Sequence, residues 1–166
     1  MRTRRDGSEG NTEPSSGAAP ARVAPTGTWR RRLPAVLETL GLVRSGLRRW
    51  LAQLGWPEDA ALDVLLAVNE AVSNAVEHGF PPAGSPDGVV DVAAEVEWIG
   101  GDRRLRLRIR DNGCWLPRPG PEVEVNRRRG LPMMSALMDE VRIHRGGPEP
   151  GDGTEVVLLG PRVPAP

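Results

Sequence analysis

The chain has 166 residues, of which 39% are hydrophobic and 27% charged, and this composition suits one domain with a single sizeable core. Basic and acidic residues balance at 22 each, so no net field favours nucleic acid or an acidic membrane surface as the main partner. Every basic residue is an arginine. The absence of lysine excludes a P-loop and a eukaryotic-type protein kinase, because both place a lysine on the phosphates.

The cysteine content and the lack of targeting signals exclude further kinds of site and location. Cys114 is the only cysteine, which excludes an intrachain disulfide and a cysteine-based zinc site. The N-terminal arginines are not followed by an apolar segment, and no run approaches the roughly 20 apolar residues that span a bilayer. We therefore expect a cytoplasmic protein with no membrane contact.

Both ends of the chain are predicted to be tails. Residues 1–27 are rich in Gly, Ser, Thr, Pro and Ala and have almost no large apolar side chains, so they cannot bury enough surface to offset their ordering entropy. We expect a disordered tail over 1–27, one domain over 28–160 and a short second tail over 161–166.

The first half of the domain is predicted to contain an edge strand and two helices. The strand covers residues 28–33. The first helix follows from apolar residues spaced by three and four, namely Val36, Leu40, Val43, Leu47, Trp50, Leu51 and Leu54. Pro57 is well placed to begin the second helix, which we expect to run to Gly79.

The second half is predicted to be two hairpins with a loop and a helix between them. Alternating apolar residues predict strands over 90–98 and 105–110, and "VRIHR" and "TEVVLL" predict a closing hairpin. A long polar loop covers 112–129, and a short helix follows over 131–138. Antiparallel strands with helices to cover one face predict an α+β fold, a two-layer sandwich of a mixed, mainly antiparallel sheet and helices.

The second helix carries a polar stripe within "EAVSNAVEH". Residues four apart drift only about 40° around a helix, so Glu70, Asn74 and His78 share one face. By itself this stripe is more typical of the solvated side of an amphipathic helix than of a site.

Three other stretches contain residue types suited to a nucleotide. Asp111 and Gly113 end a strand, where a carboxylate can accept from an exocyclic amine, although Asp-Asn-Gly is most often only a turn. In "RRRGLPMM", Gly130 precedes a predicted helix start, where free N–H groups favour phosphate, although a basic run is often only a solvated patch. In "GDGTEVVL", Thr154 begins a strand and could support a base.

In this order, the four stretches resemble the boxes of a known family. "NEAVSNAVEHGF" is similar to the N box, "DNG" to the G1 box, "RGLPMM" to the G2 box and "GTEVVL" to the final motif of the GHKL (Bergerat-fold) ATPases. Within them the chain most resembles the small anti-sigma-factor serine kinases of the RsbW and SpoIIAB type. The resemblance covers about residues 28–160 and implies the Bergerat fold.

The resemblance also implies a role for each matched residue. Glu70 would be the general base and Asn74 a ligand of Mg²⁺ and part of the ATP site, while Asp111 would accept from the adenine amine. The remaining ATP-binding positions follow in the same way: Gly113 lets the base in, Thr154 supports it, and the phosphates are lined by Arg129, Gly130 and Leu131. Residues 115–129 would form a lid, and His78 receives no assigned role.

Two positions depart from the family pattern. Trp115 stands where the second glycine of the G1 box is usual, and Arg128 stands where the first glycine of the G2 box is usual. Both lie in the expected lid, so they bear on lid closure and nucleotide affinity more than on the fold.

The resemblance therefore implies an ATP- and Mg²⁺-dependent protein-serine kinase that is also an anti-sigma factor. It would sequester a sigma factor, phosphorylate an anti-anti-sigma protein of the STAS type and form a homodimer. The alternative is a regulator with weak or no catalysis that acts by sequestration alone. A histidine kinase is disfavoured, because neither His78 nor His144 has the context of a phosphoacceptor helix pair.

Overall fold

The computed structural model describes residues 27–80, 87–114, 124–147, 149 and 151–166. Its elements in chain order are β1 (Thr28–Pro34), α1 (Glu38–Gln53), α2 (Glu58–His78), β2 (Val89–Ile99), β3 (Asp102–Asp111), α3 (Glu124–Leu137), β4 (Glu140–Arg145), β5 (Thr154–Leu159) and β6 (Val163–Pro164). Residues 1–26 of the expected tail over 1–27 lie outside the described residues. So do residues 115–123 of the expected lid over 115–129, whereas residues 124–129 form the first part of α3 instead of a loop.

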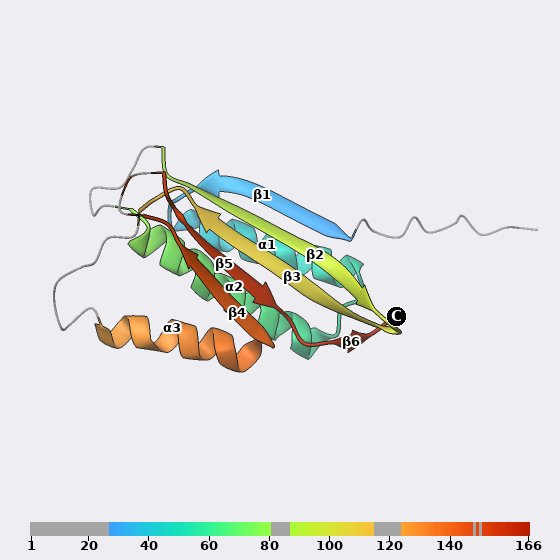
Figure 1. Ribbon diagram of the computed structural model, residues 1–166. Helices are drawn as coiled ribbons and strands as arrows, with labels where there is room; N and C mark the ends of the chain where they lie inside the picture. The colour runs from blue at the N-terminus through green and yellow to red at the C-terminus, as the bar shows by residue number, and fades with distance from the viewer. Residues whose placement is uncertain (1–26, 81–86, 115–123, 148, 150) are drawn as a thin grey trace, which may run out of the picture.

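The strands form one antiparallel sheet with the helices on a single face. The strand order is β1-β2-β3-β5-β4, with β6 also paired to β3, and every described pair is antiparallel. In Figure 1, α1 and α2 lie behind the sheet and α3 lies beside α2 near β4. The predicted α+β two-layer fold is confirmed.

The core fills the space between α2 and the middle of the sheet, and period-two alternation supplies the sheet side of it. In β3 the side chains of Leu105, Leu107 and Ile109 are buried against the helices, and the residues between them are arginines that face outward. From α2, Val68 and Val72 pack into the same cluster. Because Asp111 continues this alternation, its side chain also faces the helices.

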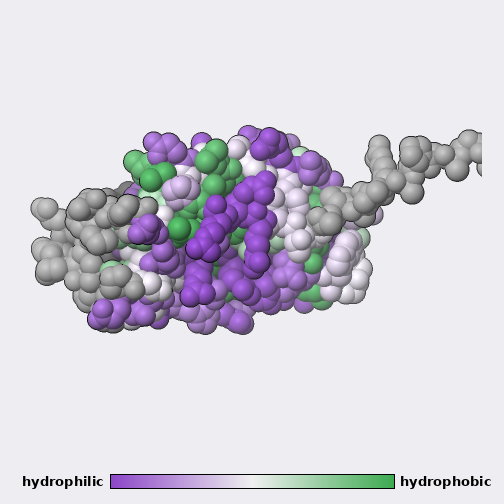
Figure 2. Space-filling view, turned by 90° about the horizontal axis from the view of Figure 1, so that it is seen from above, coloured by the Kyte–Doolittle hydropathy of each residue, from purple (hydrophilic) through white to green (hydrophobic). Residues whose placement is uncertain are grey.

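β1 is an edge strand and carries a charged surface. Arg30, Arg31 and Arg32 are consecutive and exposed, and Figure 2 shows a broad hydrophilic band across the face that contains this edge. Charged side chains on an edge strand disfavour pairing with another sheet.

The C-terminal segment does not behave as the sequence predicts. Val163 is buried in the core, and β6 pairs with the start of β3, so the expected tail over 161–166 contains a strand. The alternation of "PRVPAP" is too short to reveal this pairing, which depends on a contact with residues about sixty positions earlier.

A buried arginine holds this end of the sheet together. Arg103 donates to the carbonyl oxygens of Leu54 (2.7 Å), Gly55 (2.8 Å) and Pro164 (3.3 Å). Its guanidinium also lies 4.7 Å from the centre of the Trp56 ring, and burial lowers its pKa. We call Arg103 and these four partners the Arg103 cluster. It joins the α1–α2 turn, β3 and β6.

Candidate nucleotide site

The Asp-Asn-Gly turn at the end of β3 sends its residues in three directions. Asp111 is 5% exposed and faces the helices. Asn112 faces β2, where its Oδ1 accepts from the N–H of Val89 (2.7 Å). Gly113 lies against the end of α2, where a Cβ would overlap the carbonyl oxygen of Gly79. The turn therefore fixes the carboxylate between β3 and α2.

Asp111 is held through one oxygen and leaves the other available. Its Oδ1 accepts from the N–H groups of Gly113 (2.9 Å) and Thr154 (3.2 Å). Both of these hydrogen bonds go to Oδ1, and neither involves Oδ2. Burial raises the pKa of the Asp111 carboxyl, while the backbone N–H groups of Gly113, Thr154 and Asp111 itself and the charge of Arg110 oppose this shift. An acceptor kept in place in this way suits a ligand amine.

The loop between β4 and β5 closes onto the same turn. Gly153 has φ of 64°, a left-handed conformation that favours glycine, and its N–H donates to the carbonyl oxygen of Gly113 (2.9 Å). Gly151 donates to the same carbonyl (3.2 Å). This clamp brings Thr154, the first residue of β5, against Asp111.

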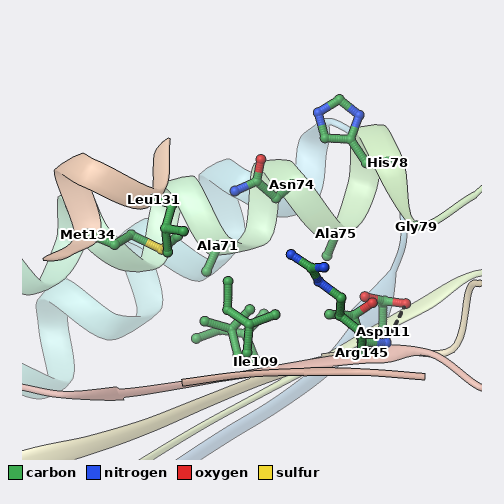
Figure 3. Close-up of a pocket in the computed structure, with 13 residues that line it drawn as sticks. Ala71, Asn74, Ala75, His78, Gly79, Ile109, Asp111, Leu131, Met134 and Arg145 are labelled. Carbon is green, nitrogen blue, oxygen red and sulfur yellow. Dashed lines mark hydrogen bonds between the residues drawn. The ribbon is translucent and has the colours of Figure 1, made fainter. Parts of the chain in front are cut away.

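A cavity of about 320 Å³ opens between α2, α3 and the sheet at this point. Figure 3 shows Asn74, Ala75 and His78 above it on α2, with Asp111 and Ile109 below on the sheet. Its full lining is Ala71, Asn74, Ala75, His78, Gly79, Ile109, Asp111, Leu131, Met134, Ile143, Arg145, Thr154 and Val156. The small side chains of Ala71 and Ala75 leave a slot between α2 and apolar residues of the sheet. Its shape and lining suit a flat ring with a polar edge at Asp111.

The polar stripe of α2 divides between the cavity and α3. Asn74 and His78 line the cavity, but Glu70 does not. A Cβ built on Gly130 would lie 3.0 Å from Oε2 of Glu70 and 3.4 Å from Nδ2 of Asn74. Gly130 therefore allows α3 to pass close over the stripe, and both side chains lie beside its backbone.

The start of α3 corrects the sequence analysis. The helix was expected over 131–138, with free N–H groups around Gly130, but it begins at Glu124 and passes through Gly130 to Leu137. The segment "EVNRRR" has no apolar period, so its helical state is not visible in the pattern. In this arrangement a helix N-terminus at Gly130 cannot be the basis of phosphate binding.

Several predicted site residues come together and others lie to one side. Asn74, Asp111, Leu131 and Thr154 all line the cavity. Gly113 does not, and its lack of a side chain is explained by its packing against α2. The side chain of Arg129 lies outside the described residues. The functional roles of all these positions remain predictions.

Three residues of the cavity lining are not predicted from the sequence. Arg145 and Ile143 come from β4, and both face α2 because residues two apart share a face of a strand. The alternation of "VRIHR" predicts that Ile143 and Arg145 share a face of the strand. It does not predict that this face borders a cavity, because that depends on the neighbouring strands. Met134, also missed, is a buried residue of α3.

The donor set suits magnesium only in combination with a nucleotide. The described residues contain no group of three or more His, Cys, Asp or Glu side chains able to hold a metal ion. Mg²⁺ is commonly bound through one or two protein oxygens together with phosphate and water. The amide of Asn74 and the nearby carboxylate of Glu70 fit that pattern.

No helix among the described residues has the length and apolar character needed to cross a membrane.

Comparison with known proteins identifies a matching family and bacterial relatives of similar sequence. Residues 33–159 match the family described as histidine kinase-like ATPase domain. The serine-protein kinase RsbW of Listeria monocytogenes is 29% identical over 126 residues, which cover 68% of this chain and 76% of that protein. The anti-sigma F factor of Halalkalibacterium halodurans is 33% identical over 119 residues, covering 66% and 75%.

A solved structure agrees with the sequence relatives. The RsbU and RsbW domains of a Mycobacterium tuberculosis protein superpose with a TM-score of 0.64 and 32% identity over 85% of this chain. The chain spans about a third (34%) of that longer protein.

Proposed function

Because the chain belongs to the histidine kinase-like ATPase family, and is of the RsbW type within it, we propose that it is an ATP- and Mg²⁺-dependent protein-serine kinase and anti-sigma factor. The observation that carries the proposal is Asp111. Its carboxylate is fixed by two backbone N–H groups at the edge of a slot-shaped cavity, with one oxygen available for an amine.

The roles of the other residues follow from their places around this cavity. Thr154 lies beside Asp111 and supports the base, while Asn74 binds Mg²⁺ on the opposite wall. Glu70, one helical turn before Asn74, takes the proton from the attacking serine hydroxyl. The phosphates would lie beside Leu131, with no role for free N–H groups at Gly130, because α3 continues through that residue. Mg²⁺ supplies charge neutralisation at the transferred phosphate.

The proposed partners are a sigma factor that is sequestered and a STAS-type antagonist that is phosphorylated on serine. We also propose that the chain is a homodimer, which light scattering of the purified protein would test. The relatives are named serine-protein kinase and anti-sigma F factor, which supports the kinase and the sigma-factor parts of this proposal.

A second candidate is a regulator that binds ATP or its partner without transferring phosphate. One observation favours it: Glu70 does not line the cavity and lies beside the backbone of α3 at Gly130. For catalysis, α3 would have to shift so that the carboxylate can reach a substrate hydroxyl.

Paired variants of α2 distinguish the two candidates. Glu70→Gln keeps the size of the side chain but cannot take a proton, so ATP binding should persist while phosphoryl transfer to the antagonist falls by roughly 10²–10⁴. Asn74→Ala removes a metal ligand, so Mg²⁺-dependent ATP binding should itself weaken. Radiolabel transfer and calorimetric binding are measured on the same samples. Wild-type transfer in Glu70→Gln would remove Glu70 from the mechanism, and a wild-type protein that binds ATP without transfer would favour the second candidate.

A further inference from the structure

Arg145 is the cationic residue at the Asp111 end of the cavity. It is the last residue of β4 and lies opposite Thr154 in the register of β4 and β5. Thr154 donates its N–H to Asp111, so β5 links the carboxylate and the arginine. Figure 3 shows the Arg145 side chain extending from the sheet toward α2 within the lining of the cavity.

The two charged side chains offer complementary hydrogen-bonding groups. Oδ1 of Asp111 is occupied by two backbone N–H groups, so Oδ2 is the atom that can accept from a ligand. Arg145 carries only donors, in a planar group. A ligand edge that places a donor beside an acceptor would be complementary to both side chains.

An adenine ring has such an edge. Its exocyclic amine donates, and the ring nitrogens N1 and N7 on either side of that amine accept. The walls of the slot are apolar, since Ala71 and Ala75 face Ile109 and Val156 across it, so orientation within the plane of the ring depends on the polar groups at the edge.

We propose that Arg145 is a specificity-determining residue that donates to a ring nitrogen of adenine beside the amine held by Asp111. This inference rests on the proposed function, because it assumes that the cavity takes ATP. The Arg145 side chain is exposed and lies in the lining of the cavity. Recognition is then shared between β3 and β4 rather than carried by Asp111 alone.

The test combines two variants with modified nucleotides. Arg145→Met keeps most of the apolar stem and removes the donors. Arg142→Met is the matched control, because Arg142 is on the same strand but on the opposite face of the sheet, where it pairs with Glu140. Binding of ATP, and of ATP analogues in which N1 or N7 is replaced by carbon, is measured by calorimetry with Mg²⁺.

Removing the donors should weaken ATP binding roughly tenfold, a typical effect of losing one charge-assisted hydrogen bond. In the wild type, one of the two analogues should bind more weakly than ATP, and Arg145→Met should abolish that difference. The analogue concerned identifies N1 or N7 as the acceptor. Arg142→Met should behave as the wild type.

Two results would overturn the inference while leaving the proposed function intact. One is equal or tighter ATP binding by Arg145→Met. The other is a penalty for the analogue that persists in the variant. A wild-type protein that binds no ATP would instead refute the proposed function together with this inference.

Discussion

Replacing Asp111 with asparagine separates its role in binding from its role in the fold. The amide oxygen can still accept from the N–H groups of Gly113 and Thr154, so the turn at the end of β3 should keep its shape. The amide nitrogen then stands where Oδ2 was. It would meet the amine of the ligand donor to donor.

The expected loss follows from the hydrogen bond that is removed. A hydrogen bond to a charged acceptor contributes about 1.5–3 kcal/mol, which corresponds to a roughly ten- to hundredfold rise in the Kd for ATP. Calorimetry with ATP and Mg²⁺ measures it. Asp102→Asn is the matched control, because it makes the same change at the opposite end of β3, away from the cavity.

Asp111→Asn should weaken ATP binding but should not lower the stability of the fold. Because burial raises the pKa of Asp111 in the folded protein, its contribution to stability is complete below its unfolded pKa and is lost as the pH rises through the folded pKa. Asparagine does not ionise, so at neutral pH the variant should be at least as stable as the wild type in urea unfolding.

The raised pKa of Asp111 also predicts how ATP binding depends on pH. ATP affinity of the wild type should decrease as the pH falls toward the raised pKa of Asp111, since only the carboxylate accepts through both oxygens. The variant should lack this dependence. Equal ATP affinity in Asp111→Asn and wild type at neutral pH would refute the assignment of Asp111 to the base.

Two further predictions concern the glycine beneath α3 and the far end of the sheet. Gly130→Ala should weaken ATP binding, because its Cβ would press on Glu70, whereas Gly41→Ala in α1, which meets nothing within 4 Å, should raise stability by roughly 0.5–1 kcal/mol with binding unchanged. ATP binding equal to the wild type in Gly130→Ala would contradict this prediction, because it would show that α3 can shift enough to accommodate the Cβ. Arg103→Met should lower the free energy of unfolding by about 2–4 kcal/mol, since it leaves carbonyl oxygens at Leu54 and Pro164 without their donor, and should leave ATP affinity unchanged. A loss of unfolding free energy below 1 kcal/mol in urea unfolding of Arg103→Met would contradict the assigned role of the Arg103 cluster.

Much of the fold follows from residue periodicity. The strict alternation of β3 predicts both its buried face and the inward direction of Asp111, and the spacing of four in α2 predicts that Asn74 and His78 lie on one wall. These features depend only on backbone geometry, which the order of the residues reveals directly.

What the sequence did not predict depends on tertiary contacts. Val163 pairs with β3 although its own segment looks like a tail. Trp98 continues the apolar alternation of β2 but is 64% exposed, and it lies beyond the residues of β2 that pair with β1. Arg145 enters the cavity only because β4 lies beside β5. Each outcome is decided by a neighbour that is distant in sequence.

The Arg103 cluster gives the molecule two unlike ends. It joins the first residues of β3 to the α1–α2 turn and β6, whereas the cavity lies at the last residue of β3, about 26 Å away along the strand. Local opening has its highest cost where several elements share one buried group, and its lowest cost where a cavity separates them. Amide protons should therefore exchange slowly at the Arg103 end and quickly around Asp111. The protein can then rearrange to admit and release a ligand at one end while the other end keeps the two layers in register.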